Sequence, residues 1–141
     1  MKPATKFVSV LIMLSIIACI SWSVNAVSST LYVSAGSSAY SSETDETSGY
    51  HSLCHMALTY VHFNNYPENS IPSSYYVYAR LYRTYPLTAA SNNASFSQVN
   101  SNGYDYSYLS GFGLDGQKFI IKSNSNLNIY YSATFYWYAN A

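Results

Sequence analysis

The clearest alternation of apolar and polar positions lies near the C-terminal end, over residues 127–138. One set of alternate positions is apolar or aromatic and consists of Leu127, Ile129, Tyr131, Ala133, Phe135 and Trp137. The other set includes Tyr130, Ser132, Thr134, Tyr136 and Tyr138. Because alternate side chains of a strand point to opposite faces, we expect the first set to face the core and the second to face outward. The segment is long for a strand, so we also expect a bend or a bulge in it.

Two other segments have strong strand patterns. Residues 74–84 alternate in the same way, and their predicted inward positions are Tyr75, Val77, Ala79 and Leu81. Residues 51–63 are apolar on both faces, which is typical of a covered strand in the middle of a sheet. The two faces of that strand are predicted to be Leu53, Ala57, Val61 and Phe63 on one side and Cys54, Met56, Leu58 and Tyr60 on the other.

Shorter strands and the turns between them complete the predicted fold. The weaker strand candidates are residues 30–34, 39–42, 94–99, 104–110 and 117–123. Asn102-Gly103 and Asp115-Gly116 are strong hairpin signals, and they predict an antiparallel meander of the last three of these strands. Residues 41–49, 64–72 and 85–93 are predicted loops.

Short strands separated by frequent turn signals predict an all-β protein, either a two-sheet sandwich or a small barrel. We favour an antiparallel two-sheet β-sandwich of about 7–8 short strands, formed as one domain by residues 27–141. The composition agrees with this class, since all 17 tyrosines lie after residue 26 and helix formers are scarce there. Tyrosine suits a pleated, half-buried surface, whereas the abundant serine and asparagine favour turns.

The N-terminal region has the pattern of an export signal. Lys2 and Lys6 precede an uncharged apolar run over residues 7–20, which is too short for a membrane-spanning helix. Residues 1–26 are therefore predicted to be a secretory signal peptide that is cleaved after Ala26, which leaves no transmembrane segment in the mature chain. A second interpretation is a lipobox ending at Cys19, which would make the protein a membrane-anchored lipoprotein.

The charge of the mature chain limits its partners. After residue 26 there are four cations and six carboxylates, and 4 − 6 gives a net charge of −2. Nucleic-acid binding needs a basic patch that neutralises phosphates, so we exclude it. Cys54 is the only cysteine after the predicted cleavage site, so no intramolecular disulfide is expected. A buried, unreactive Cys54 is the simplest interpretation.

Candidate chemical groups are few. Four residues have side chains that can bind a metal ion, namely His51, Cys54, His55 and His62. On a strand these side chains would not converge on one ion. The acidic cluster of Glu43, Asp45 and Glu46 lacks calcium-loop spacing, and we expect it to form a solvated loop. Neither a paired-carboxylate site nor a nucleophile motif is evident. We therefore predict no catalytic residue, no metal, no cofactor and no enzymatic activity.

The candidate site is an outward-facing set of aromatic side chains. Its members are Tyr76, Tyr78, Arg80, Tyr82, Tyr130, Tyr136 and Tyr138. Tyrosine combines a flat apolar ring with a hydroxyl, which suits it to bind a cell-surface polysaccharide or a protein. The alternative is that these tyrosines only stabilise the sheet through cross-strand pairs and bind nothing.

Two further hypotheses arise from the strand segments. The runs Ile129-Tyr130-Tyr131-Ser132-Ala133-Thr134-Phe135-Tyr136-Trp137 and Val77-Tyr78-Ala79-Arg80-Leu81 resemble the lactococcin 972 family of small secreted bacteriocins. That resemblance covers the second half of the chain and implies a β-sandwich that acts on the envelope of competing bacteria. The uncharged run 130–138 also has the composition of segments that pair between chains, so self-association as a structural surface protein is a third hypothesis.

Overall fold

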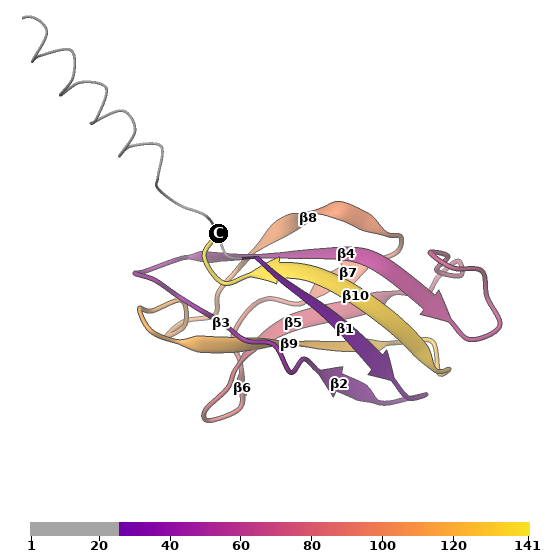
Figure 1. The fold of residues 1–141 in the computed structure, drawn as a ribbon, viewed down its shortest axis with the longest axis horizontal. Helices are drawn as coiled ribbons and strands as arrows, with labels where there is room; N and C mark the ends of the chain where they lie inside the picture. The colour runs from indigo at the N-terminus through magenta and orange to yellow at the C-terminus, as the bar shows by residue number, and fades with distance from the viewer. Residues whose placement is uncertain (1–25) are drawn as a thin grey trace, which may run out of the picture.

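The computed structural model describes residues 26–141, which form ten β-strands and no helix (Figure 1). The predicted signal peptide and Cys19 lie outside the described residues, apart from Ala26. The strands are β1 (Val27–Val33), β2 (Ser38–Tyr40), β3 (Asp45–Glu46), β4 (Leu53–Phe63), β5 (Val77–Arg83), β6 (Thr88–Ala89), β7 (Ala94–Phe96), β8 (Asn100–Ser107), β9 (Lys118–Ser125) and β10 (Tyr131–Tyr138).

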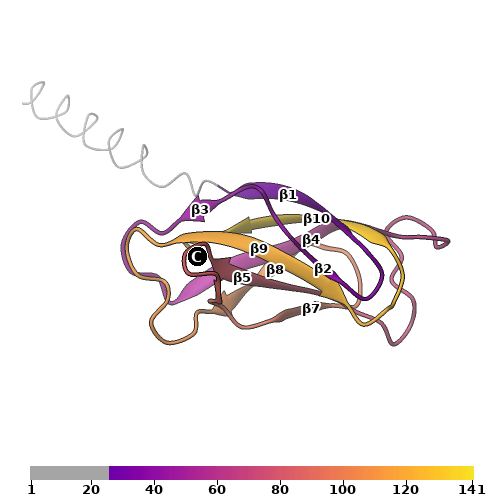
Figure 2. The ribbon, with the colours of Figure 1, turned by 90° about the horizontal axis from the view of Figure 1, so that it is seen from below.

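The strands form two antiparallel sheets that face each other across one hydrophobic core (Figures 1 and 2). Sheet A has the order β1-β10-β4-β8. Sheet B has the order β2-β9-β5-β6, with β3 also paired to β9 and β7 to β5. Phe135 and Trp137 of sheet A pack in the same core as Phe119 and Ile121 of sheet B. The predicted all-β class is therefore confirmed, and the arrangement is sandwich-like.

The alternation predicted for the two best strand patterns is confirmed within β10 and β5. Tyr131, Ala133, Phe135 and Trp137 are buried on one face of β10, and Val77, Ala79 and Leu81 are buried on one face of β5. Both predicted strands were too long at their N-terminal ends. Leu127 and Ile129 pack against the core from the segment before β10. Tyr75 is exposed rather than inward, because β5 begins only at Val77.

The central position of β4 is confirmed, and its outer face is only partly covered, since Ala57 is fully buried there whereas His55, Tyr60 and His62 are half-buried. Thr134 of β10 pairs with Tyr60, and Phe135 pairs with Leu58, so Thr59 is an extra residue in β4. A one-residue bulge moves the following side chains to the opposite face. The core side is therefore Cys54, Met56 and Leu58 before the bulge and Val61 and Phe63 after it. The bend or bulge expected in the last strand is thus found in the pairing of β10 with β4, and the extra residue belongs to β4.

The predicted meander is wrong, because its strands alternate between the two sheets. Strands β7 and β9 pair with β5 in sheet B, whereas β8 pairs with β4 in sheet A. Asn102-Gly103 lies inside β8, at an irregularity opposite Ala57, rather than in a hairpin turn. Asp115-Gly116 does lie in a turn, in which the Gln117 amide donates to the Leu114 carbonyl, but this turn leads from one sheet to the other.

Two of the three predicted loops contain short strands. The dipeptide strands β3 and β6 add to the eight predicted strands and raise the total to ten. Both pair at the ends of longer strands of sheet B, β3 with β9 and β6 with β5. A two-residue segment has too little alternation to be recognised from its pattern, and its strand character comes from these neighbours.

Candidate functional site

The structure divides the seven predicted site residues between opposite outer faces of the molecule. Tyr76, Tyr78, Arg80 and Tyr82 belong to β5 or directly precede it, in sheet B. Tyr136 and Tyr138 belong to β10 in sheet A, and Tyr130 lies just before that strand. The inward neighbours of both groups are buried in the shared core, so the two groups point away from each other. They form two surfaces rather than one.

We call the surface on sheet B the basic face, and it consists of Tyr40, Tyr76, Tyr78, Arg80, Tyr82 and Lys122. Its centre is a row across three strands, in which Lys122 of β9 pairs with Tyr40 of β2 on one side and with Arg80 of β5 on the other. Tyr40 and Lys122 were not among the predicted site residues, because their strands are short or weakly patterned. Only the register of β2 and β9 brings them beside the predicted residues.

Lys122 is held between two tyrosine rings. Its Nζ lies 5.7 Å from the centroid of the Tyr40 ring and 5.2 Å from that of the Tyr82 ring. The two rings themselves are perpendicular, with centroids 5.4 Å apart. Cation–π contacts of this length are attractive and fix the ammonium group over the sheet. The result is a compact unit of one cation and two aromatic rings.

Arg80 lies directly across from Lys122, and its guanidinium Nε donates to the carbonyl oxygen of Ser91. Within residues 26–141, neither Arg80 nor Lys122 forms an ion pair. Two like charges at directly opposed positions of neighbouring strands destabilise a sheet. The nearby Lys118 differs, because its Nζ lies 3.9 Å from a carboxylate oxygen of Glu46.

Tyr76 and Tyr78 extend the basic face along β5. Their rings are stacked with centroids 6.1 Å apart. The backbone of Tyr76 is fixed on both sides, since its amide donates to Asn126 Oδ1 and its carbonyl accepts from Ser125 Oγ. The stacked pair therefore stands on a backbone that is fixed at Tyr76.

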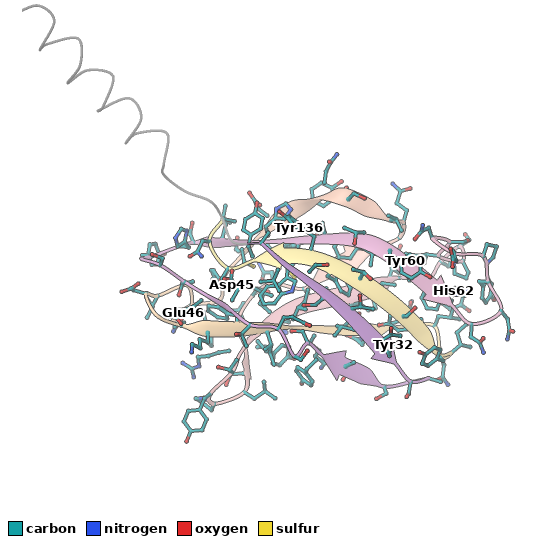
Figure 3. All side chains as sticks on the ribbon, in the orientation of Figure 1. Tyr32, Asp45, Glu46, Tyr60, His62 and Tyr136 are labelled. Atoms are coloured by element: carbon teal, nitrogen blue, oxygen red, sulfur yellow. The ribbon has the colours of Figure 1, made fainter. Side chains whose placement is uncertain are left out.

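The opposite surface, on sheet A, we call the tyrosine–histidine face. It consists of Tyr32, His55, Tyr60, His62, Tyr136 and Tyr138. Figure 3 labels Tyr32, Tyr60, His62 and Tyr136 on this side of the molecule. The register aligns Tyr32 with Ser132 and Ser132 with His62 across β1, β10 and β4. Tyr32 is the most exposed member, at 68%. Tyr130 lies at the end of this face, and its carbonyl accepts from the Asn64 amide.

Two polar groups of the tyrosine–histidine face are paired with neighbouring carboxylates. The His55 ring stacks on Tyr138 at 4.7 Å, and its Nδ1 lies 2.7 Å from Asp105 Oδ1. The Tyr60 hydroxyl donates to Glu68 Oε1 over 3.3 Å. Desolvation raises the pKa of Tyr60, and the Glu68 carboxylate raises it further. Every Lys and Arg after residue 26 lies on β5 or β9, so this face carries no cation from the described residues.

The three histidines and Cys54 lie in different surroundings. His55 and His62 are on the outer side of β4, Cys54 is in the core, and His51 precedes the strand. No group of three or more His, Cys, Asp and Glu side chains among residues 26–141 is placed to hold a metal ion. Burial raises the pKa of the Cys54 thiol to about 12, so the thiol stays protonated and unreactive near neutral pH.

The acidic cluster is more structured than the expected solvated loop. Asp45 and Glu46 form β3, and the Asp45 carboxylate accepts from the amides of Glu46 and Ala139. Hydrogen bonding to the backbone lowers the pKa of Glu43. These contacts connect the segment before β4 to the C-terminal end of β10, which is a structural role.

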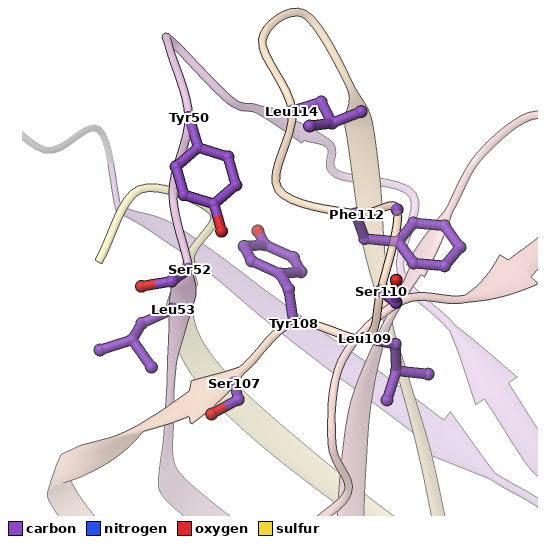
Figure 4. A pocket seen from close by; sticks show the side chains of 10 residues that line it. Tyr50, Ser52, Leu53, Ser107, Tyr108, Leu109, Ser110, Phe112 and Leu114 are labelled. Carbon is purple, nitrogen blue, oxygen red and sulfur yellow. The ribbon is translucent and has the colours of Figure 1, made fainter.

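A pocket of about 390 Å³ lies where β4 begins, beside the segment that follows β8 (Figure 4). It is lined by Tyr50, Ser52, Leu53, Ser107, Tyr108, Leu109, Ser110, Gly111, Phe112 and Leu114. None of these residues has a side chain that is charged at neutral pH. The Tyr108 hydroxyl donates to the Ala139 carbonyl over 2.8 Å, and burial raises its pKa, so it does not act as a base. The lining can hold a small neutral group but offers no acid–base pair.

No sequence signal pointed to this pocket. Its two walls are separated by more than 50 residues, and the pairing of Leu53 with Ser107 brings them together. Gly113 allows the close approach, because it has a φ of 78° and a Cβ there would overlap the His51 carbonyl oxygen. The pocket therefore depends on long-range strand pairing, which residue patterns do not reveal.

Comparison of the chain with protein-family models, with curated proteins and with solved structures gives no match. The fold and the chemistry of the two outer faces are therefore the basis of the functional proposal. No helix in residues 26–141 has the length and apolar character needed to cross a membrane.

Proposed function

We propose that this chain is a secreted, non-enzymatic binding protein that acts at a cell surface or in the extracellular matrix. In this proposal the mature domain is a β-sandwich whose basic face is the binding surface. The observation that carries the proposal is the row of Tyr40, Lys122 and Arg80, flanked by Tyr78 and Tyr82. Four of the seven predicted site residues lie on this one surface.

The chemistry of the basic face favours a polysaccharide over a small molecule. Aromatic rings stack on the apolar faces of sugar rings, and tyrosine hydroxyls and cations bond to their substituents. The face lies on a sheet rather than in a cavity, and an extended chain can contact several such positions at once. Because the Lys122 ammonium lies over two tyrosine rings and the Tyr76 ring stacks on Tyr78, less side-chain entropy is lost on binding.

The test separates the two faces, using full-length protein expressed for export and purified from the medium. We expect the Tyr78→Ser/Tyr82→Ser variant to bind whole cells and cell-wall polysaccharide at least about tenfold more weakly, a loss of roughly 1.4 kcal/mol. Tyr136→Ser is the matched control from the tyrosine–histidine face. Circular dichroism and thermal unfolding verify the fold of each variant. Equal losses in both variants, or none in the first, would exclude the basic face as the site.

Export itself is part of the proposal and has a separate measurement. Cleavage after Ala26 gives a mature protein that begins at Val27, the first residue of β1. Intact mass determination of the exported protein should show this N-terminus. A lipid-modified Cys19 would instead support the membrane-anchored alternative, and retention of residues 1–26 would contradict both.

The bacteriocin alternative follows from the resemblance to the lactococcin 972 family. The segments that carry the resemblance lie mainly in β10 and β5, which are interior strands of their sheets. The same purified protein, applied to growing bacteria, distinguishes this alternative. Growth inhibition at low concentration would favour the bacteriocin, and repeated absence of inhibition would remove it.

Self-association is the third proposal, and the structure changes where it would occur. Most of the run 130–138 lies in β10, which pairs with β1 on one side and β4 on the other. The edges of sheet A are β1 and β8 instead. The register of β1 on β10 is continuous, and β1 contains neither charge nor proline, the usual features that discourage edge pairing. A monomeric mass at all concentrations in sedimentation experiments would rule this out.

A further inference from the structure

The cations of the described residues are concentrated on one sheet. Arg80 and Arg83 lie on β5, Lys118 and Lys122 lie on β9, and these two strands are neighbours. Lys118 is close to Glu46, and the Arg83 guanidinium lies over the Phe112 ring at 5.2 Å. Arg80, Arg83 and Lys122 have no carboxylate partner among residues 26–141, and of these three only Arg80 and Lys122 point to the outside of sheet B. Both are on the basic face.

The strand positions of Arg80 and Lys122 are directly opposed, and like charges at such positions destabilise a sheet, so we expect this pair to lower the stability of the free protein. A neutral residue at either position would remove the repulsion. A bound anion reverses the effect, since it is attracted by both groups at once. The positions therefore suit a ligand with negative charge, whose binding compensates for the repulsion.

Aromatic rings surround this pair of cations on the same face. The Tyr40 and Tyr82 rings contact Lys122, and the stacked pair Tyr76–Tyr78 continues along β5. Alternate residues on one face of a strand are about 7 Å apart and neighbouring strands are about 4.8 Å apart. Rings and cations are thus available at short, regular distances. A polymer with both sugar rings and acidic groups matches this arrangement.

Nucleic acid fits the face less well than an acidic polysaccharide. Each phosphate contact contributes through a cation, and two free cations on a domain of net charge −2 supply few such contacts. The planar end of the Arg80 guanidinium that is not engaged by Ser91 suits a carboxylate. We propose that the basic face binds a polysaccharide that carries carboxylate groups on its sugar rings. This inference rests on the proposed function and specifies its ligand class.

The test compares two polymers with the same sugar backbone, polygalacturonate and its fully methyl-esterified form, in which the carboxylates are replaced by neutral esters. We expect the exported protein to bind polygalacturonate at least about tenfold more tightly than the ester, with an affinity that falls as salt rises. The Arg80→Gln/Lys122→Gln variant should bind both polymers equally and lose most of the salt dependence. Lys118→Gln is the matched control from the same strand, and it should behave like the wild type.

The possible outcomes separate this inference from the proposed function. Equal binding of the two polymers by the wild type, with weaker binding by Tyr78→Ser/Tyr82→Ser, would overturn the charged ligand and leave the binding function intact. No binding of polygalacturonate also overturns the inference, and the whole-cell assay then decides the function separately. Cell binding that resists periodate but is lost after protease treatment would indicate a protein partner and likewise overturn it.

Discussion

On the outer face of sheet A the tyrosines lie beside histidines and carboxylates, whereas on the outer face of sheet B they lie beside Arg80 and Lys122. In the first arrangement His55 is paired with Asp105 and stacks on Tyr138, and Tyr60 is bonded to Glu68. In the second, two cations occupy directly opposed strand positions, and no ion pair within residues 26–141 compensates them.

The difference teaches that tyrosine enrichment alone does not identify a binding surface. Cross-strand aromatic and hydroxyl pairs stabilise a sheet by about 0.2–1 kcal/mol each and need no ligand. The contact between Thr30 Oγ1 and Thr134 Oγ1, at 2.9 Å, is one such pair on sheet A. The neighbours of the tyrosines distinguish the two faces, because only the basic face contains an arrangement that a free sheet would not favour.

The largest effect on stability is expected from a substitution that disturbs sheet A and leaves the residues of the basic face unchanged. Gly103 has a φ of 63°, and a Cβ there would lie 2.5 Å from the Met56 carbonyl oxygen and 2.6 Å from the Ala57 Cβ. Gly103→Ala should lower the free energy of unfolding by about 3 kcal/mol, from backbone strain and displacement of β8. Chemical denaturation measures the loss.

Gly49→Ala is the control for Gly103→Ala. Gly49 also has a positive φ, 83°, but a Cβ added there would have no atom within 4 Å, so only about 1 kcal/mol of strain is expected. Well below its unfolding temperature, Gly103→Ala should still bind cell-wall polysaccharide like the wild type. Loss of binding by the folded variant would show that sheet A takes part, and the two faces would no longer be separable.

A second effect tests the core between the faces. Desolvation raises the pKa of Cys54 to about 12, and burial raises the pKa of Tyr131, whose hydroxyl contacts Ser123 across the sheets at 2.8 Å. A buried group whose pKa is raised by folding stabilises the protein while it is protonated in both the folded and the unfolded states. For the thiol this stabilisation is fully present below the unfolded-state pKa of 9.0, and it is lost as the pH rises toward the folded-state pKa.

Stability should therefore decline above about pH 9. Near pH 10.5 the thiol should account for about 2 kcal/mol of that decline, from roughly 1.5 pH units at 1.36 kcal/mol each. Urea unfolding of the wild type and of Cys54→Ala, at pH 8 and pH 10.5, measures this share as the difference between the two declines. Parallel declines would mean that Cys54 is accessible in the folded state and that the core is less closed than its burial indicates.

Residue patterns could predict the interior of this fold better than its topology. The alternation in β5 and β10 identified buried residues such as Leu81 and Trp137, because each strand has one face on the core. The extra residue at Thr59 and the pairing of β8 with β4 arise from contacts between distant segments. The hairpin predicted at Asn102-Gly103 was wrong for the same reason, since a glycine with positive φ can occupy a strand irregularity as well as a hairpin turn.

The candidate site was predictable only in part. The outward direction of Tyr78, Arg80 and Tyr82 follows from the period of β5. The placement of Tyr136 on the opposite side of the molecule does not follow from periodicity. The period of a strand shows which side chains share a face, but it does not show to which sheet the strand belongs. Lys122 could not be linked to Arg80 without the register of β9 on β5. That pairing brings together the two cations of the basic face.

The smallest predicted effect tests that pairing directly, through its response to salt. Repulsion between Arg80 and Lys122 weakens when added salt shortens the screening length from about 10 Å at 0.1 M to about 3 Å at 1 M. The stability of the wild type relative to Arg80→Gln should therefore rise by a few tenths of a kcal/mol between these concentrations of sodium chloride. The stability of the wild type relative to Lys118→Gln should fall over the same range of salt, since there the attraction between Lys118 and Glu46 is screened. Urea unfolding of the three proteins gives both differences, and a general effect of salt on the fold drops out of each because it is common to the wild type and the variant. Equal signs would show that Arg80 and Lys122 do not repel each other in the free protein, and the basic face would then be no more unusual than the tyrosine–histidine face.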